Sequence, residues 1–144
     1  MTSQSFANHR QTVPVFHFFL LPILTLTLIG SVVNLVKSWG DHQRIYSASL
    51  IVVLAIVTLM LSFICRIFAL KAQDRAIRAE ENLRHFVITG KLIDPRVTIR
   101  QVIALRFASD GEFEALAKKA AHEGTEPDDI KRSIQEWRGD TYRV

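Results

Sequence analysis

The sequence predicts an all-α membrane protein: a two-helix transmembrane hairpin whose second helix extends into the cytosol, followed by a small three-helix tail. Residues 11–36 and 45–65 contain no Asp, Glu, Lys or Arg. Each stretch is long enough to span, because about 20 residues at ~1.5 Å rise cover ~30 Å of hydrocarbon. The second stretch continues without Gly or Pro into a densely charged segment that ends near Thr89. These two observations predict one long helix that passes from lipid into water.

Composition limits the protein to one domain, or to a membrane anchor with one small domain, in 144 residues. All but three of the 18 Lys and Arg residues, and all but one of the 14 Asp and Glu residues, follow Cys65. Such mixed charge is typical of a solvated, salt-bridged surface and argues against nucleic-acid binding. A single cysteine excludes an intrachain disulfide framework.

Four parts follow from these patterns. We expect a cytoplasmic N-terminal segment at 1–13, a first transmembrane helix with a short outer loop at 14–44, a second transmembrane helix with a long cytoplasmic extension at 45–90, and a cytoplasmic helical tail at 91–144. The apolar run that ends at Val36 is longer than the apolar core of a signal peptide. We therefore interpret it as a retained span.

The first span is expected to begin at Pro14 or Val15, since proline suits the first turn of a helix. Pro22 lies inside the span and should bend it, because proline removes a backbone hydrogen bond. Gly30 and Asn34 are four residues apart and share a face, which favours a close helix contact. An ion or substrate ligand is the alternative for Asn34.

His17 is the titratable residue of the first span, and its role stays open. It lies near the start of the span, within reach of the interface, and no second intramembrane histidine accompanies it to bind haem. We favour interfacial or inter-helix hydrogen bonding over haem, metal binding or proton transfer.

The loop at 37–44 is short, so the two spans should be antiparallel with both termini on one side. Its basic residues are Lys37 and Arg44. The opposite flanks carry more basic residues: Arg10, Arg66, Lys71, Arg75, Arg78 and Arg84. Because positive flanks stay inside, we expect both termini in the cytoplasm.

Small and hydroxyl residues recur along the second span, among them Ala48, Ala55, Thr58 and Ser62. Such residues let helices approach closely in lipid. We favour packing of the hairpin on itself, with packing against another protein as the alternative.

The charged extension carries an apolar seam with a helical period. Its members are Phe68, Ala72, Ala76, Ala79, Leu83 and Phe86. We expect the tail to pack on this seam, within one chain or between chains. Three i, i+4 pairs should stabilise the exposed faces, namely Asp74–Arg78, Glu80–Arg84 and Glu81–His85.

Capping patterns divide the tail into three short helices. Gly90 ends the long helix, and Asp94-Pro95 makes a turn. The helix starts are then Thr98, a capping box of Ser109 with Glu112, and a start at Thr125 to Asp129, while Gly124 ends the middle helix. Ile130, Ile134 and Trp137 are expected to form the apolar stripe of the last helix. A unit of about fifty residues is marginal alone, which favours packing on the long helix.

Several longer motifs resemble one family of small, uncharacterised bacterial membrane proteins. These motifs are FANHR, PVFHF, YSASL, LKAQDRAIRAEENLRHF, GKLIDPRVTIRQVIALRFASD and IQEWRGDTYRV, and together they cover nearly the whole chain. The family is classed only as a domain of unknown function. The resemblance implies an inner-membrane protein with two spans, and it implies no catalytic residue.

No motif for catalysis stands out, since the sequence has no Gly-rich phosphate loop, G-x-S-x-G, H-E-x-x-H or Cys/His framework. We therefore expect no enzyme, no cofactor and no metal. The favoured function is a membrane-anchored adaptor or accessory subunit, whose partners are lipid and another membrane protein or further copies of itself. Its partner-facing surface is expected at Arg75, Arg78, Glu80, Glu81 and Arg84. The alternative is a homo-oligomeric pore or transporter component with Gly30, Asn34, Thr58 and Ser62 at its helix contacts.

Overall fold

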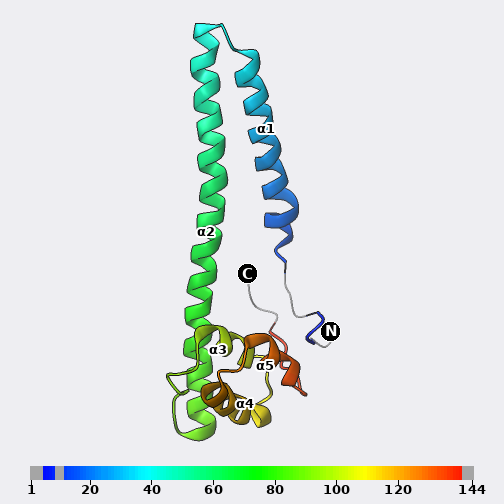
Figure 1. Ribbon diagram of the computed structural model, residues 1–144, viewed down its shortest axis with the longest axis vertical. Coiled ribbons are helices and arrows are strands. Elements are labelled where there is room, and N and C mark those ends of the chain that lie inside the picture. Colours follow the sequence, from blue (N-terminus) through cyan, green and yellow to red (C-terminus); the bar gives the residue numbers. More distant parts are fainter. Residues whose placement is uncertain (1–4, 9–11, 141–144) are drawn as a thin grey trace. The chain divides into compact units, whose positions relative to one another are not determined.

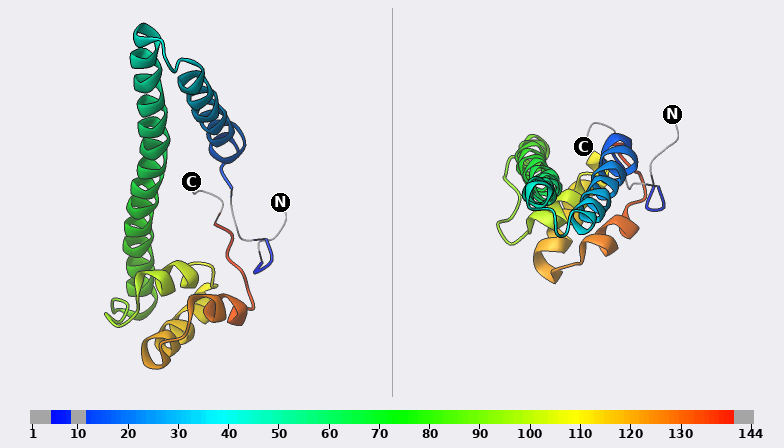
Figure 2. Two further views of the ribbon diagram at one scale, coloured as in Figure 1. Left: turned by 45° about the horizontal axis from the view of Figure 1, so that its top comes forward. Right: turned by 90° about the horizontal axis from the view of Figure 1, so that it is seen from above.

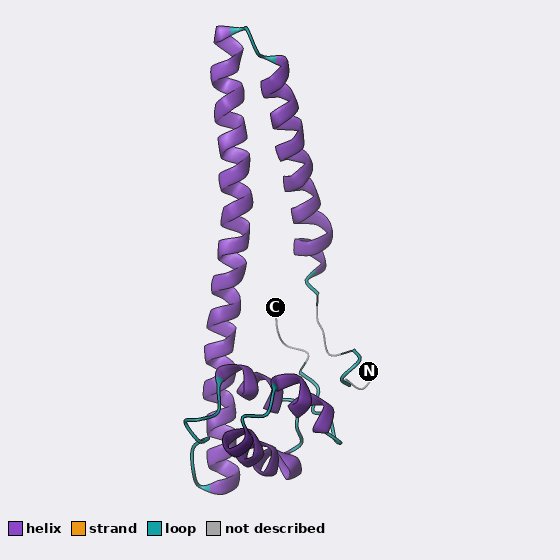
Figure 3. Ribbon diagram, viewed as in Figure 1, coloured by secondary structure: helices purple, strands orange, loops and turns teal. Residues whose placement is uncertain are grey.

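The computed structural model describes residues 5–8 and 12–140, and all of its regular elements in these ranges are helices joined by turns and loops. Its elements are the π-helix η1 (Val15–Leu20) and the α-helices α1 (Leu21–Lys37), α2 (His42–Thr89), α3 (Ile99–Leu105), α4 (Asp110–Glu123) and α5 (Pro127–Ser133) (Figure 1). Helices and loops account for all of the ribbon in Figure 3 that is not grey. The all-α prediction is confirmed.

The chain forms two compact units. One comprises Thr12–Ala69, and the other comprises Leu70–Val144 together with Met1–Gln11. Helix α2 contributes to both units without a break, because its 48 residues form one continuous helix. We call residues 90–140, which follow α2 and contain α3, α4 and α5, the cap.

The first unit is a helical hairpin. The helical segments Val15–Lys37 and His42–Thr89 are both long and apolar enough to cross a membrane. Large apolar side chains point outward from them, with Leu26 68% and Leu54 65% exposed. Helix α2 begins slightly before the predicted Ile45, because the Asp41 carboxylate accepts the backbone N–H groups of Gln43 and Arg44.

Pro22 acts through a π-helical turn. Proline has no N–H to donate to the carbonyl of Phe18, and its ring crowds the preceding turn. The π-helix η1 ends at Leu20, two positions before Pro22, and the Leu21 N–H donates to the Phe16 carbonyl five residues back. The predicted irregularity is therefore a wider turn at this place in the span. In the same turn, Nδ1 of His17 bonds the Val13 carbonyl at 2.9 Å, so this histidine is hydrogen-bonded locally.

The inner face of the hairpin agrees with the predicted one only in part. Its buried residues are Ser31, Ser38, Ala48 and Ala55. At the end of the hairpin nearer η1, the Phe16 and Phe63 rings meet edge to face at 6.2 Å. The two predicted alanines do pack inward, as expected of small residues at a helix contact.

Three residues predicted at helix contacts do not pack within the hairpin. Gly30, Asn34 and Thr58 are exposed, and Ser62 is half-buried. A side chain added at Gly30 would meet nothing within 4 Å. The hydroxyls of Thr58 and Ser62 donate to carbonyls of their own helix, so they need no partner across the hairpin.

The second unit builds the cap onto the last turns of α2. Figure 2 shows α3, α4 and α5 gathered on one side of these turns. The largest fully buried side chains are Leu105, Phe107, Phe113 and Ile130, and Ile77 of α2 belongs to the same core cluster. The cap therefore completes its core with a residue of the long helix. This agrees with the expectation that about fifty residues bury too little surface alone.

Several predicted helix ends are confirmed. Thr98 and Gln101 form a reciprocal capping box at the start of α3. Gly90 and Gly124 follow α2 and α4 with φ of 74° and 65°, a left-handed conformation that glycine adopts without steric cost. Asp94 begins the predicted turn, since the Val97 N–H donates to its carbonyl at 3.0 Å.

Two predicted features of the cap are wrong. Ser109 is the N-cap of α4, but its side chain makes no capping hydrogen bond. The last helix ends at Ser133, and Ile134 is already extended with ψ of 123°. Ile134 is nevertheless buried, and Trp137 packs against the core from an isolated antiparallel bridge to Ala108. The apolar residues therefore reach the core from an extended segment, which a helical period does not detect.

Candidate functional site

The cap packs on a face of α2 that the hydrophobic pattern did not indicate. Ile77, Glu81 and His85 are the buried residues of this face, and they follow each other at intervals of four. Leu83 and Phe86 are 64% and 51% exposed, so the predicted packing of the tail on the seam is wrong within one chain. Ala72, Ala76 and Ala79 are exposed as well. The hydrophobic pattern indicated the wrong face of α2 because the buried face contains a glutamate and a histidine.

Arg84 joins α2 to the cap at the centre of this face. Its Nε donates to Oδ1 of Asp110 at 2.7 Å, and its Nη2 donates to the Ala108 carbonyl at 2.8 Å. Its Nη1 donates to Oε2 of Glu81 at 3.1 Å. The guanidinium also lies 4.5 Å from the centre of the Phe113 ring. One side chain thus contacts α2, the start of α4 and the core.

The ion pairs of α2 differ from the predicted i, i+4 set. Arg84 pairs with Glu81 at i, i+3 and with Asp110, instead of with Glu80. The side chains of Arg84 and Glu81 are only 10% and 8% exposed. Removal of such a pair from water is costly unless both charges are well bonded, which is why Arg84 uses all three of its nitrogens. The third predicted pair, between the described residues Asp74 and Arg78, does not form.

His85 holds the turn that leads from α2 into the cap. Its Nδ1 bonds the Lys91 carbonyl at 2.6 Å, and its ring meets Phe113 edge to face at 5.9 Å. The Asn82 side chain accepts the Ile93 N–H at 3.3 Å in the same connection. The predicted Glu81–His85 pair is therefore replaced by contacts to the backbone that follows the helix.

Glu112 stabilises the extended segment after α5. Its two carboxylate oxygens accept the N–H groups of Gln135 and Glu136 at 3.0 and 2.8 Å. The segment also pairs with the α3–α4 connection, since Ser109 N–H donates to the Glu136 carbonyl and Arg138 N–H donates to the Phe107 carbonyl. The predicted capping box fails because Glu112 turns toward this segment instead of toward Ser109.

Arg106 is a buried cation within the cap itself. Its Nε lies 3.3 Å from Oδ2 of Asp140, and its guanidinium lies 4.7 Å from the centre of the Phe107 ring. Trp137 packs on the same Phe107 ring in a tilted arrangement, with the two ring centres 5.1 Å apart. These contacts place the polar ends of two arginines over aromatic rings of one core.

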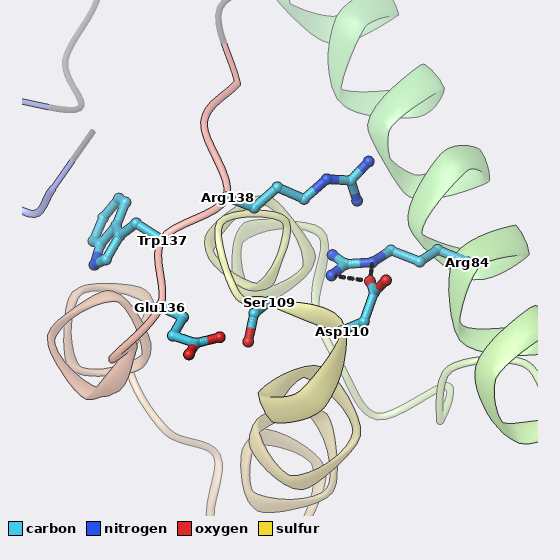
Figure 4. Close-up of a pocket in the computed structure, with 6 residues that line it drawn as sticks. All are labelled: Arg84, Ser109, Asp110, Glu136, Trp137 and Arg138. Atoms are coloured by element: carbon cyan, nitrogen blue, oxygen red, sulfur yellow. Dashed lines mark hydrogen bonds and ion pairs between the residues drawn. The ribbon is translucent and has the colours of Figure 1, made fainter. Parts of the chain in front are cut away.

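A shallow depression of about 490 Å³ opens where these elements meet. Figure 4 shows that Arg84 faces Asp110, while Trp137 turns away from both. The other lining residues are Ser109, Glu136 and Arg138. Arg84 and Asp110 are bonded to one another, so this part of the depression serves the joint between helix and cap.

Two exposed carboxylates of the cap have lowered pKa values. Hydrogen bonds from the side chain and the backbone N–H of Arg96 lower the pKa of Asp94 from 3.8 to about 2. A hydrogen bond from Lys118 lowers the pKa of Glu114. Within the described ranges, no three His, Cys, Asp or Glu side chains lie close enough together to hold a metal ion.

The predicted partner-facing residues fall into two groups. Arg75, Arg78 and Glu80 lie exposed on α2, as a partner-facing surface requires. Glu81 and Arg84 face the cap instead, so for these two the prediction is wrong. Reasoning from the sequence also missed Asp110 and Glu112 as joint residues, because their partners lie 23 to 26 positions away.

Comparison with known proteins gives one match. No curated protein and no solved structure matches this chain. A model for a family of unknown function (DUF6526) matches residues 1–144. The match spans the whole sequence, including every motif that carried the resemblance to an uncharacterised family. The chain therefore belongs to the DUF6526 family.

Proposed function

We propose that this protein is a non-enzymatic, membrane-anchored adaptor or accessory subunit of a larger membrane complex. The observation that carries the proposal is the joint at Arg84. The helix that supplies the apolar segment of the hairpin also supplies Ile77, Arg84 and His85 to the cap. A cap that shares its core with residues of α2 is held against that helix, which suits a part that presents a surface to a neighbour.

The exposed apolar surface of the hairpin supports insertion into a membrane. Outward side chains such as Leu26, Leu54 and Val57 are more than half exposed along both helices. Soluble monomers rarely expose apolar surface on this scale, whereas lipid tails match it. In our proposal the hairpin lies in a bacterial inner membrane.

The basic flanks and the N-terminal segment support one orientation. The residues that follow the apolar part of α2 are richer in Lys and Arg than the turn at 38–41, which favours a cytoplasmic cap. The Phe6 ring lies 5.1 Å from the guanidinium of Arg132 in α5, which brings the N-terminal segment to the cap. Both termini then lie on the cytoplasmic side.

The use of charged groups in the cap supports a structural rather than a catalytic role. Arg84 donates to Glu81 on the same helix, and Glu112 accepts two backbone N–H groups. Groups engaged in this way are held in place and are not aimed at a substrate. An adaptor needs such a rigid support beneath its exposed surface.

Purification from native membranes in a mild detergent tests the proposal. We expect wild-type protein to travel with at least one other membrane protein in fixed stoichiometry. Arg84→Ala should lose this companion while the protein stays in the membrane fraction, because the cap separates from α2. Lys71→Ala, at an exposed position of the same helix outside the predicted partner-facing surface, is the matched control for a general effect of charge removal.

Three outcomes would contradict the proposal. Recovery of the protein in the soluble fraction would contradict the proposed membrane anchor. Recovery of the protein from the membrane with no companion protein would contradict the proposed adaptor function. Ion or solute flux through liposomes that contain this protein alone would favour a pore instead.

A further inference from the structure

The seam of α2 is left open by the cap. From Ala72 to Phe86 its residues follow at intervals of 4, 3, 4 and 3, which is the spacing of the core positions of a coiled coil. All of them are exposed, and Leu83 and Phe86 are large. The neighbouring Val87 is 75% exposed. Water-facing apolar side chains at this spacing require a helix partner.

The seam and the cap occupy different sides of α2. At about 100° per residue, the centre of the seam lies roughly 180° around the helix from the centre of the buried residues Ile77, Glu81 and His85. Figure 2 shows the three cap helices gathered on one side of α2, and the residues of the seam are exposed. A second helix can therefore pack on the seam without displacing the cap.

The charges beside the seam are complementary to a parallel copy of the same helix. Arg75 and Glu80 are exposed and flank the seam on opposite sides. They are five positions apart, which is the offset between facing flank positions of two parallel helices in register. Arg75 of one copy would then face Glu80 of the other, and two-fold symmetry repeats the pair.

A membrane anchor imposes the parallel orientation. Two copies inserted with the same topology send α2 out of the bilayer in the same direction. Three alanines in the seam let the two helices approach closely, and Leu83 with Phe86 closes the contact at the end nearer Gly90. We propose that two copies of this chain pair in parallel through the seam of α2, with Arg75 facing Glu80 across the interface. This inference rests on the proposed membrane anchor.

Disulfide trapping in native membranes tests the pairing. On a Cys65→Ser background, Ala76→Cys and Ala79→Cys should form covalent dimers after mild oxidation. Facing core positions bring Cα atoms near the 5.5–6 Å that a disulfide needs. Arg78→Cys is the matched control, since it is exposed on the same helix but away from the seam. We expect several-fold less dimer from it.

A charge reversal tests the register. Arg75→Glu on the Ala79→Cys background should reduce the dimer yield, because it places two acids across the interface. The double variant Arg75→Glu, Glu80→Arg should restore the yield. The two residues lie about 140° apart around their own helix, so restoration requires a second chain.

The outcomes separate the pairing from the anchor. Equal dimer yields at Ala76→Cys, Ala79→Cys and Arg78→Cys would overturn the pairing, as would a cross-linked product with the mass of a different protein. Failure of the double variant to restore the yield would overturn the register. Alkaline carbonate extraction of the same membranes reports on the anchor alone: a protein released by carbonate contradicts the proposed function whatever the dimer yield.

Discussion

Nε of Arg84 donates to Oδ1 of Asp110 at 2.7 Å, although the two residues are 26 positions apart. The bond joins α2 to the first residue of α4. An acid at this position also suits the positive end of the α4 dipole, so Asp110 stabilises its own helix and the joint together. The joint between helix and cap is thus a specific ionic contact above an apolar core.

Arg84→Ala is expected to destabilise the cap by about 3 kcal/mol. The substitution leaves the buried Glu81 carboxylate without its partner, and loss of one member of a buried pair costs about this much. The free energy of unfolding of the cap, measured by denaturant titration of the protein in nanodiscs, checks the value. Arg78→Ala should change it by no more than about 0.5 kcal/mol. Similar effects of the two variants would contradict the joint.

The two acidic partners of Arg84 are expected to differ in importance. Glu81→Ala should cost about 2 kcal/mol, because Arg84 would lose a buried charge partner. Asp110→Ala should cost less than about 1 kcal/mol, since the Asp110 side chain is 75% exposed and water screens its pair. The same denaturant titration compares them. A larger loss from Asp110→Ala would show that the exposed partner holds the joint.

The two N-caps of the cap are expected to respond differently to alanine. Thr98→Ala should cost about 1 kcal/mol, because the Thr98 hydroxyl and the Gln101 side chain bond each other's backbone. Ser109→Ala should cost less than about 0.5 kcal/mol, because the Ser109 side chain makes no capping bond. Thermal unfolding followed by circular dichroism distinguishes the two. Equal losses would mean that Ser109 caps α4 in solution.

Glu112 is expected to protect two backbone amides. In Glu112→Ala, the N–H groups of Gln135 and Glu136 lose their acceptors and should exchange with solvent faster. Glu112→Gln should be intermediate, since one of its two carboxylate oxygens is replaced by an N–H₂ group. Amide hydrogen exchange of the peptide that covers 134–138 measures this order. Unchanged exchange in Glu112→Ala would contradict the contact.

Asp94 is expected to make the stability of the cap pH-dependent in acid. Its pKa is about 2 in the folded protein and 3.8 ordinarily, so the unfolded chain binds the proton first as the pH falls. The stabilisation by ionised Asp94 is therefore present above about pH 4 and is lost between about pH 4 and 2. Asp94→Asn lacks this contribution. The difference in unfolding free energy between wild type and Asp94→Asn should shrink across that interval, and a constant difference would contradict the assignment.

Local signals in the sequence predicted the helices well. Uncharged runs identified the hairpin helices, and Thr98, Gly90 and Gly124 marked helix ends through backbone geometry that depends only on near neighbours. These features depend on residues within four positions of one another. The length of α2 was predictable for the same reason, since nothing in 45–89 interrupts a helix.

The face on which the cap packs could not be predicted from the same signals. A hydrophobic period favours the seam with Leu83 and Phe86, yet the cap covers Glu81 and His85. Burial of these two depends on Arg84, Phe113 and the Lys91 carbonyl, which the fold brings together from distant positions. Glu112 was misassigned for the same reason. A capping box is a local pattern, whereas Glu112 accepts hydrogen bonds from residues 23 and 24 positions away.

The contacts that hold the cap together also bear on how fast it folds. The hydrogen bonds from Arg84 to Ala108, from Gln101 to Thr125 and from Gln135 to Glu112 each join residues 23 or 24 positions apart. Helical domains usually fold fast because their contacts are local, and each non-local bond adds a loop-closure cost before it stabilises anything. The cap should therefore fold more slowly than its helical content suggests. A nascent chain that ends after α3 has none of these three bonds, and it gains the last of them only when the extended segment after α5 arrives.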